Sequence, residues 1–513
     1  MSDARGKVIF GAKPLAIESI VALAEGRADA VFSDDPAFKA KIDRGAAHLR
    51  RYLDGGGTVY GVTTGFGDSC VVQVPQQLID ALPHNLVRFH GCGTGRILDE
   101  TEAAAVLAVR LAALCRGWSA VRWELLGRLR DLLNLRVLPR IPAEGSVGAS
   151  GDLTPLSYVA ALLIGERECT YEGAVRDAAE CLAQVGLEPL RLEPKESLAL
   201  MNGTSVMAAL GCLAFARAQR LARLCAAITA MASDITRGNR AHFDDRIFAA
   251  KPHPGQRRCA AWIRGDIDFD ASAHDGPRLQ DRYSIRCAPH VIGVLVDALP
   301  MARAFLETEL QGANDNPLVD PDTGDILHGG NFYGGHACFA LDALKAAVAN
   351  LADLVDRQIA LVCNETMSHG LPANLILRRG PEGAVHHGFK AMQISASALA
   401  AEALKLTMPA SVFSRSTECH NQDKVSMGTI AARDCLRILD LTETAAAIGV
   451  LVMCQGVDLR AGEGCHSRAR AMHAAVRASI PVVDEDRRMD LDIAAVLASY
   501  RAGDLPIGED DAS

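Results

Sequence analysis

Long apolar segments dominate the chain, and their length and composition predict helices. Thr204–Thr236 is rich in Ala and Leu and contains no proline, and Pro289–Leu310, His336–Cys363 and His387–Leu406 have a similar character. An average helix in a globular protein has roughly 10–14 residues. These segments therefore predict a bundle of unusually long helices that pack side by side.

Polar residues mark where two further helices begin. Asp34-Asp35-Pro36 precedes Ala37–Leu53, and Asp99 precedes the Ala-rich segment Glu100–Cys115. Aspartate accepts hydrogen bonds from the free amide groups of a first helical turn, and proline fits that turn without losing a bond. We expect a helix to start at each of these positions.

Strand signals are few. Lys7–Phe10 predicts one short strand, Cys169–Arg176 turns at Glu172-Gly173, and Leu318–Leu327 turns through Asp320-Pro321-Asp322-Thr323-Gly324. Turn-forming residues between short apolar segments are typical of hairpins. The fold expected from these patterns is mainly α-helical, with a little sheet in the first part of the chain.

Composition and charge narrow the function classes. The chain has 513 residues, 49% of them hydrophobic, and a net charge of −9 from 53 basic and 62 acidic residues. No run of Lys and Arg suggests nucleic-acid binding. Met1–Lys13 contains no long apolar segment, and Ile448–Met453 is much shorter than the roughly 20 residues that span a bilayer. We expect a cytoplasmic protein without membrane contact.

The sequence contains none of the common motifs that bind metals or nucleotides. The 15 cysteines are scattered without a CxxC pair and predict small buried side chains in a reducing compartment. No HExxH motif or paired Cys/His spacing predicts a metal site. Several glycine clusters occur, but none fits a phosphate-binding loop, so no nucleotide is expected.

One glycine-rich segment suggests an unusual chemistry. In Gly148-Ala149-Ser150-Gly151-Asp152, attack of the Gly151 amide nitrogen on the Ala149 carbonyl carbon would close a five-membered ring. Loss of two waters, one of which carries the Ser150 hydroxyl, would leave an exocyclic methylidene group. Gly151 has no Cβ to hinder this approach. The tripeptide Ala-Ser-Gly alone is equally compatible with an ordinary turn.

The longer string, Ala149-Ser150-Gly151-Asp152-Leu153-Thr154-Pro155-Leu156, resembles the histidine, phenylalanine and tyrosine ammonia-lyases. These enzymes carry 4-methylidene-imidazol-5-one (MIO), formed autocatalytically from Ala-Ser-Gly. The resemblance extends over roughly Val8 to Met472 and recurs in separate motifs in the family's order. It implies a carbon–nitrogen lyase that acts on an aromatic amino acid and uses neither a metal nor a nucleotide.

The resemblance assigns roles to residues in the other motifs. Tyr60, in Tyr60-Gly61-Val62-Thr63-Thr64-Gly65-Phe66-Gly67, matches the base that removes the β-proton. For this role the site must lower the pKa of the tyrosine or pass the proton directly. Arg286 matches the arginine that binds the substrate carboxylate, for which a guanidinium fork is suited. Tyr283 matches a second catalytic tyrosine. The remaining positions matched to the substrate pocket are Gly67, Phe89, His90, Leu153, Asn202, Gln280, Asn331, Phe332, Glu418 and Gln422.

Taken singly, these residues have simpler explanations. A tyrosine such as Tyr60 is most often packed in a core, an asparagine such as Asn202 caps a helix or turn, and an arginine such as Arg286 forms a surface ion pair. His90 is equally compatible with a buried histidine that is hydrogen-bonded to the backbone. The functional interpretation depends on their joint occurrence.

Two positions suggest the substrate. Gln422 stands where histidine lyases commonly have glutamate, and phenylalanine and tyrosine lyases typically have glutamine there. Phe89-His90 combines an apolar side chain with a polar group that could bind a ring hydroxyl. The expectation is elimination from tyrosine, with phenylalanine and ring-substituted analogues also possible, giving a trans-cinnamate-type acid. The alternatives are a histidine ammonia-lyase that gives urocanate, a 2,3-aminomutase, and, more remotely, an inactive helical scaffold or binding protein.

The family resemblance also implies an architecture. Its members have a mainly α-helical fold, an elongated bundle of long helices with a smaller mixed N-terminal region that bears the MIO loop. They are homotetramers whose sites combine residues of three subunits. For this chain we expect an MIO-bearing domain at residues 1–200, a long-helix bundle at 201–410 and a C-terminal helical region at 411–513.

Overall fold

The computed structural model describes residues 5–270 and 277–508 and divides into two compact units. Unit 1 comprises residues 1–216, 302–342 and 409–433, and unit 2 comprises 217–301, 343–408 and 434–513. The division falls inside four long helices: α9 (Ser205–Ile235), α13 (Ala288–Leu310), α14 (Gly335–Cys363) and α16 (Gly428–Leu459). The expected separation into three sequence segments stays a prediction.

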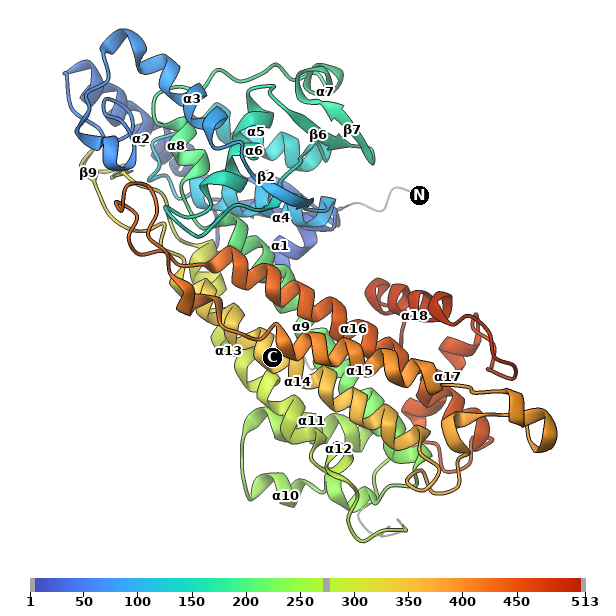
Figure 1. Cartoon of the computed structure of the whole chain (residues 1–513). Coiled ribbons are helices and arrows are strands. Elements are labelled where there is room, and N and C mark those ends of the chain that lie inside the picture. The colour runs from blue at the N-terminus through green and yellow to red at the C-terminus, as the bar shows by residue number, and fades with distance from the viewer. Residues whose placement is uncertain (1–4, 271–276, 509–513) are drawn as a thin grey trace. The chain divides into compact units, whose positions relative to one another are not determined.

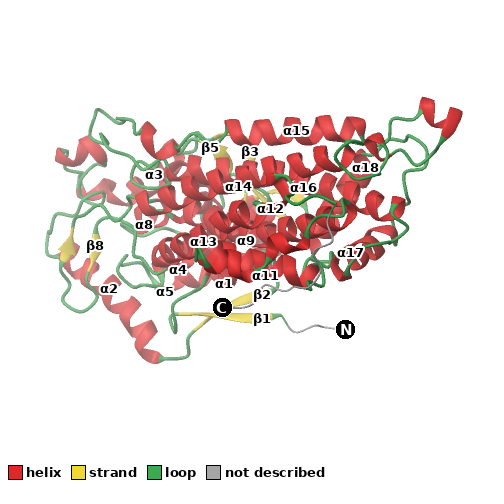
Figure 2. Ribbon diagram, turned by 90° about the horizontal axis from the view of Figure 1, so that it is seen from below, coloured by secondary structure: helices red, strands yellow, loops and turns green. Residues whose placement is uncertain are grey.

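Helices account for most of the structure, as Figure 2 shows by their colour. The mainly α-helical fold with long helices is confirmed. Four of these helices coincide with predicted segments: α9, α13, α14 and α15 (Lys390–Lys405). None of the helices in the described ranges is long and apolar enough to cross a membrane.

Unit 1 contains the mixed part of the fold (Figure 1). Its strands form three two-stranded sheets, β1–β2, β3–β5 and β8–β9, and one three-stranded sheet with the order β4–β6–β7. The β1–β2 pair is parallel and the others are antiparallel. The strands are β1 (Gly6–Phe10), β2 (Ala28–Phe32), β3 (Thr94–Ile97), β4 (Leu138–Pro139), β5 (Pro142–Glu144), β6 (Glu168–Tyr171), β7 (Ala174–Asp177), β8 (Leu318–Val319) and β9 (Ile326–Leu327). The predicted first strand and both predicted hairpins are therefore present.

The helices of unit 1 begin as their polar residues predict. Asp35 accepts a hydrogen bond from the amide of Ala37, and Asp99 and Glu102 form a reciprocal capping box. The other helices of this unit are α1 (Ile17–Ala24), α2 (Pro36–Asp54), α3 (Leu82–Phe89), α4 (Glu100–Leu114), α5 (Trp123–Leu135), α6 (Leu153–Leu163), α7 (Ala178–Gln184) and α8 (Glu196–Met201), with 3-10 turns at Gly67–Val71, Gln76–Ala81 and Ala410–Phe413.

The core of unit 1 surrounds α4, which is buried on all sides from Glu102 to Leu114. Small Ala side chains let neighbouring helices approach it closely, and removal of this apolar surface from water is the main stabilising contribution. One charged side chain, that of Arg110, lies in the middle of this buried helix. Such a position is rare for an arginine without a specific partner.

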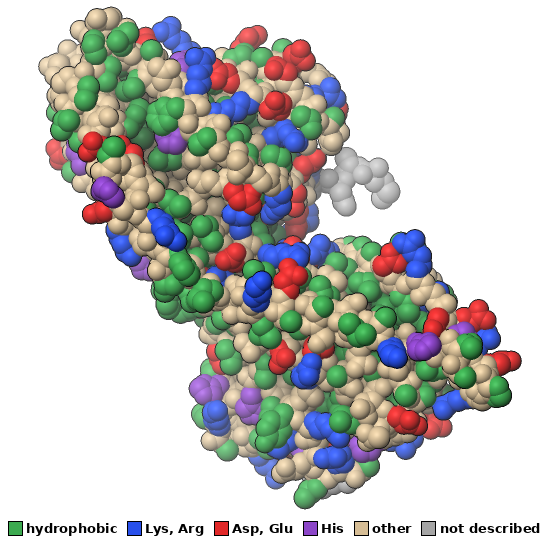
Figure 3. All heavy atoms as spheres, viewed as in Figure 1, with side chains coloured by type: hydrophobic (Ala, Val, Ile, Leu, Met, Phe, Trp, Pro, Cys, Tyr) green, Lys and Arg blue, Asp and Glu red, His purple; other side chains and the backbone are tan. Residues whose placement is uncertain are grey.

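Unit 2 is helical throughout its described secondary structure. Besides its parts of the four long helices, it contains α10 (Asp245–Ala249), α11 (Pro254–Asp266), α12 (Tyr283–Arg286), α15, α17 (Ser467–Arg477), α18 (Asp490–Ala502) and 3-10 turns at Arg240–Phe243, Ala373–Leu375 and Gly380–Val385. On the face shown in Figure 3, basic and acidic side chains are interspersed over the surface. The cysteines are free thiols, and all but Cys70, Cys92, Cys287 and Cys419 are buried.

Candidate active site

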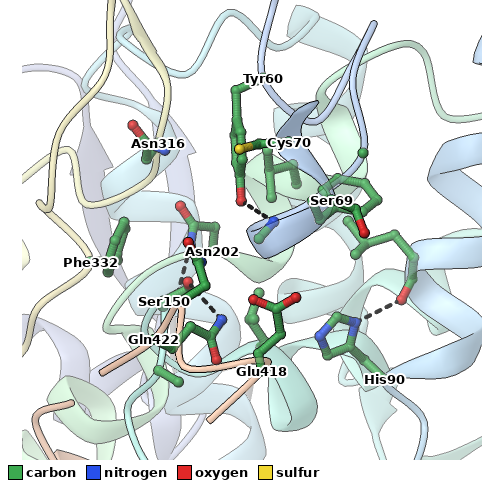
Figure 4. Close-up of a pocket in the computed structure, with 18 of the residues that line it drawn as sticks. Tyr60, Ser69, Cys70, His90, Ser150, Asn202, Asn316, Phe332, Glu418 and Gln422 are labelled. Carbon is green, nitrogen blue, oxygen red and sulfur yellow. Dashed lines mark hydrogen bonds between the residues drawn. The ribbon is translucent and has the colours of Figure 1, made fainter. Parts of the chain in front are cut away.

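A cavity of about 670 Å³ in unit 1 collects many of the predicted site residues (Figure 4). Its size lies in the range of small-molecule sites, and its lining mixes apolar side chains with a few polar groups. The predicted residues that line it are Tyr60, Gly67, Phe89, His90, Ala149, Ser150, Leu153, Asn202, Phe332, Glu418 and Gln422. Segments that are distant in the sequence thus meet around Ser150.

The tripeptide adopts a tightly constrained backbone. Ser150 and Gly151 both have a left-handed φ, of 52° and 79°. A Cβ on Gly151 would lie 2.2 Å from the carbonyl oxygen of Gly203, so glycine alone fits there. The Ser150 carbonyl accepts hydrogen bonds from Asn202 Nδ2 at 2.7 Å and from the Gly203 amide at 3.3 Å. This arrangement brings the three residues into a compressed turn whose central carbonyl is held by two donors.

Asp152 fixes the end of this turn to the start of α9. Its buried carboxylate accepts hydrogen bonds from the amides of Val206 and Met207, both at 3.0 Å, and from the hydroxyl of Ser146 at 2.9 Å. Thr429 donates a further bond. Burial raises the pKa of the Asp152 carboxyl, while these four donors act in the opposite direction. The first free amides of a long helix are thereby satisfied by the residue next to the tripeptide.

Tyr60 points into the cavity with its hydroxyl close to a backbone amide. The phenol oxygen accepts a 2.7 Å hydrogen bond from the Gly67 N–H. Burial raises the pKa of Tyr60, although this hydrogen bond acts to lower it. The site within one chain therefore does not supply the lowered pKa that a tyrosinate base would need.

Gln422 is oriented toward the tripeptide. Its Nε2 donates to the Ser150 hydroxyl at 3.3 Å, and its Oε1 accepts from the Thr417 hydroxyl at 2.8 Å. Backbone hydrogen bonds in both directions between Thr417 and Gln422 hold this geometry. The amide is thus engaged at both ends.

Glu418 and His90 provide the polar groups on another side of the cavity (Figure 4). The Glu418 carboxylate accepts from the Asp68 amide, and a Cβ on Gly67 would lie 2.3 Å from one of its oxygens. His90 Nδ1 lies 3.0 Å from the Leu86 carbonyl oxygen, which can only accept, so Nδ1 carries the proton. Burial lowers the pKa of His90. The ring is therefore neutral near pH 7, and its Nε2 is an acceptor.

Comparison with known proteins identifies the family. The model of the aromatic amino acid lyase family matches residues 15–478. The chain belongs to this family. It is 39% identical to the histidine ammonia-lyase of Koribacter versatilis over 92% of this chain and 93% of that protein, and 40% identical to that of Aromatoleum aromaticum over 91% and 89%. This membership makes it an ammonia-lyase, a carbon–nitrogen lyase that acts on an amino acid.

Solved structures of related enzymes have the same fold. The tyrosine aminomutase of Streptomyces globisporus superimposes with a TM-score of 0.90 at 36% identity, covering 98% of this chain and 97% of that one. The histidine ammonia-lyase of Trypanosoma cruzi gives a TM-score of 0.88 at 34% identity, covering 97% and 94%.

The expected preference of this lyase for tyrosine or phenylalanine is wrong. The curated relatives named above are histidine ammonia-lyases that match nearly the whole chain. The physical reason lies in Gln422, which carried much of the argument for a benzenoid ring. Its acceptor end is occupied by the Thr417 hydroxyl and its donor end faces Ser150, so the chain itself orients the amide and its residue type says little about the ring of the substrate.

Five predicted residues of the lyase lie outside the cavity lining. Gly151 follows two residues that do line it, and Asn331 donates from Nδ2 to the Ala313 carbonyl. The other three, Gln280, Tyr283 and Arg286, belong to unit 2. The proposed carboxylate-binding arginine is therefore not among the residues that line this cavity.

The cavity also contains residues that the sequence analysis did not select. Cys70 lies beside Tyr60, and Asn316 lies near Phe332 in Figure 4. Asn316 follows the end of α13 in the polar string Asn314-Asp315-Asn316-Pro317, and that concentration of polar residues was the available signal. Cys70 carried no signal, because it lies outside every recognised motif.

Proposed function

We propose that this lyase eliminates ammonia from L-histidine and releases urocanate. The proposal rests on the nearly full-length similarity to histidine ammonia-lyases. Eight curated relatives with this activity in their names are 35% to 40% identical to this chain. These relatives come from several bacterial genera and match at least 91% of this chain.

The polar groups of the cavity support an imidazole substrate. His90 presents Nε2 as an acceptor, and Glu418 presents a carboxylate. The ring of histidine has N–H groups that can donate to such acceptors, whereas the ring of phenylalanine has none. An acceptor on the cavity wall gains from such a donor, so His90 favours a ring with an N–H over an unsubstituted benzene ring.

The residues around Ser150 fit an MIO group formed from Ala149-Ser150-Gly151. The turn is already compressed, Gly151 has no room for a side chain, and two donors hold the carbonyl that the ring would retain. Asn202 Oδ1 is buried and has no hydrogen-bond partner among the described residues. When formed, the group supplies an electrophilic carbon for covalent activation of the substrate.

The remaining groups orient the substrate and move its proton. The free Asn202 Oδ1 would accept from the substrate ammonium, and Tyr60 would take the β-proton through its phenol oxygen. That oxygen is held by Gly67 N–H, which stabilises negative charge on it. Tyr60 is a base only when its proton is lost, so a further positive charge near the phenol is required.

A second copy of the chain would supply that charge. Tyr283 is 71% exposed, and the Arg286 guanidinium stacks over its ring at 4.6 Å. Arg286 donates from Nε to the Asp281 carbonyl and forms no ion pair with a carboxylate among the residues described. A half-buried arginine held in this way beside an exposed tyrosine is suited to bind a substrate carboxylate in a neighbouring subunit. We therefore propose a homotetramer with shared active sites.

A substrate panel tests the proposed function. Purified protein is incubated with L-histidine, L-tyrosine and L-phenylalanine, and the ultraviolet absorption of the unsaturated acid is followed together with ammonia release. We expect urocanate with the highest kcat/KM for histidine. Faster formation of coumarate or cinnamate would refute the histidine assignment, and a β-amino acid product would identify an aminomutase.

A variant control tests the role of Ser150. Ser150→Ala cannot provide the methylidene carbon, so its intact mass should equal that calculated from its sequence, while the wild-type protein is lighter by two waters. Ammonia release should fall to the background rate. A wild-type protein without this mass loss would contradict the proposed MIO group.

A further inference from the structure

A buried arginine lies directly behind the two donors that hold the Ser150 carbonyl. Arg110, on α4, has no exposed surface. Its Nη1 donates to the Asn202 carbonyl at 2.9 Å, and its Nη2 lies 3.5 Å from Asn314 Oδ1. The Nε atom has no hydrogen-bond partner among the described residues. The guanidinium therefore contacts the Asn202–Gly203 segment, which holds the Ser150 carbonyl.

The positive charge of Arg110 is not neutralised by a direct ion pair among the residues described. The carboxylates that act electrostatically on it are those of Asp315 and Asp152. Asp315 pairs with Lys195 at 2.6 Å and accepts from Ser119, while Asp152 accepts its four bonds elsewhere. Burial lowers the pKa of Arg110 to about 10, so the guanidinium remains charged near pH 7. Its field therefore acts on the groups it contacts with little screening.

The contact is specific because a single peptide group connects Arg110 to Ser150. The Asn202 carbonyl and the Gly203 N–H belong to the same peptide bond. Arg110 donates to that carbonyl, and the amide of the same group donates to the Ser150 carbonyl. A charge-assisted bond on the oxygen of a peptide polarises the group and strengthens its N–H as a donor. A Cβ on Gly203 would lie 2.5 Å from Arg110 Nη1, so this contact requires glycine.

We propose that Arg110 is a positioning residue that activates the Ser150 carbonyl through the Asn202–Gly203 peptide, and thereby promotes both formation and electrophilicity of the MIO group. The inference rests on the proposed function, because it presumes that the tripeptide cyclises. It assigns a role to a side chain that touches neither substrate nor the cavity.

The chemistry of ring formation explains why this carbonyl matters. The Gly151 nitrogen bonds to the Ala149 carbonyl carbon, and the Ala149 oxygen leaves as water with the amide protons of Gly151 and Ser150. The second water takes the Ser150 hydroxyl and the Ser150 α-proton. Removal of that α-proton places negative charge on the adjacent Ser150 carbonyl oxygen. A donor that is strengthened by Arg110 stabilises this charge.

The same oxygen receives charge when a nucleophile adds to the finished group. The methylidene carbon is conjugated with the Ser150 carbonyl, so an electron pair that enters at the carbon moves toward that oxygen. Stabilising the oxygen therefore raises the reactivity of the carbon. Removing one oxyanion donor lowers enzymatic rates by roughly 10²–10³-fold. Because Arg110 acts through an intervening peptide, we expect a loss of about tenfold or more.

The test compares Arg110→Met with Arg223→Met. Arg223 is a buried arginine of α9 that pairs with Asp266 in unit 2, so its replacement imposes a similar folding burden without touching the tripeptide. Intact mass reports the fraction of each purified protein that has lost two waters. The rate at which 2-mercaptoethanol consumes the near-ultraviolet absorbance reports the electrophilicity. We expect R110M to mature more slowly and to react about tenfold more slowly, while folded R223M matches wild type.

Arg110→Lys is a second variant, which keeps the proposal testable if Arg110→Met does not fold. A lysine buried at this position would lose its proton at a lower pH than arginine. The thiol-trapping rate of R110K, divided by the wild-type rate at each pH, should therefore fall as the pH rises. A flat ratio, or an R110M protein that matures and reacts like wild type, would overturn the role of Arg110. Absence of the mass loss in wild type would instead refute the proposed function.

Discussion

The junction between the tripeptide and α9 gives a quantitative prediction. Asp152 is fully buried and accepts four hydrogen bonds, from the amides of Val206 and Met207 and the hydroxyls of Ser146 and Thr429. Asp152→Ala leaves both amides without an acceptor in a site that water does not reach. Asp152→Asn can still accept both amide bonds through its oxygen, and both hydroxyls can rotate to accept from its NH₂ group.

The two substitutions should differ in cost. Each buried amide that loses its partner costs about 1–3 kcal/mol, so D152A should destabilise the protein by about 2–6 kcal/mol. D152N turns all four charge-assisted bonds into neutral ones, a loss of about 1 kcal/mol each, and the removed cost of burying a charge, of the order of several kcal/mol, offsets at least half of it. We therefore expect D152N to cost at most about 2 kcal/mol.

Thermal unfolding at a fixed protein concentration ranks the three proteins, and hydrogen exchange locates the effect. The amides of Val206 and Met207 should exchange much faster in D152A than in wild type, with D152N in between. If D152A unfolded like wild type and retained slow exchange at both amides, the carboxylate would not cap α9 in solution, and the explanation of how the tripeptide is anchored would fail.

Three further changes test other parts of the site. Tyr60→Phe should retain the loss of two waters but reduce kcat roughly 10²–10⁴-fold. Because burial raises the pKa of Tyr60, the wild-type kcat should increase toward alkaline pH. A flat pH profile would exclude tyrosinate as the base. Gly151→Ala should show no mass loss, because its Cβ would lie 2.2 Å from the Gly203 oxygen. Lys195→Met should destabilise the fold by about 3–5 kcal/mol in thermal or denaturant unfolding, because it leaves the buried Asp315 carboxylate unpaired, and a melt unchanged from wild type would refute this.

The helical parts of the fold could be predicted because local composition decides them. Asp35 and Asp99 mark helix starts in the sequence, and both side chains cap their helices in the structure. The bounds of α16 could not be predicted in the same way, since Gly449 and Gly456 interrupt its apolar pattern. In the structure these glycines allow close packing: a Cβ on Gly456 would lie 2.5 Å from Ile235, and one on Gly449 would lie 3.0 Å from Val355. Their role in helix packing can be recognised only when the neighbouring helices are in place.

The tripeptide could be predicted for a different reason, since its chemistry depends on consecutive residues. The groups that support it could not, because they come from distant segments. Arg110 stands in a run of Ala, Val and Leu, and a charge in such a run indicates a buried partner without naming it. Only the folded chain shows that the partner is the Asn202 carbonyl.

Gln422 shows why residue type alone misled the choice of substrate. A glutamine amide has a donor end and an acceptor end, so it can serve a substrate ring or its own chain equally well. Here the backbone pairing of Thr417 with Gln422 turns the amide toward Ser150, and the Thr417 hydroxyl occupies the acceptor end. His90 and Glu418 also line the cavity, and under the proposed function their acceptors suit a substrate with a ring N–H. The residue type of a side chain therefore does not predict the substrate until its orientation, which the fold imposes, is known.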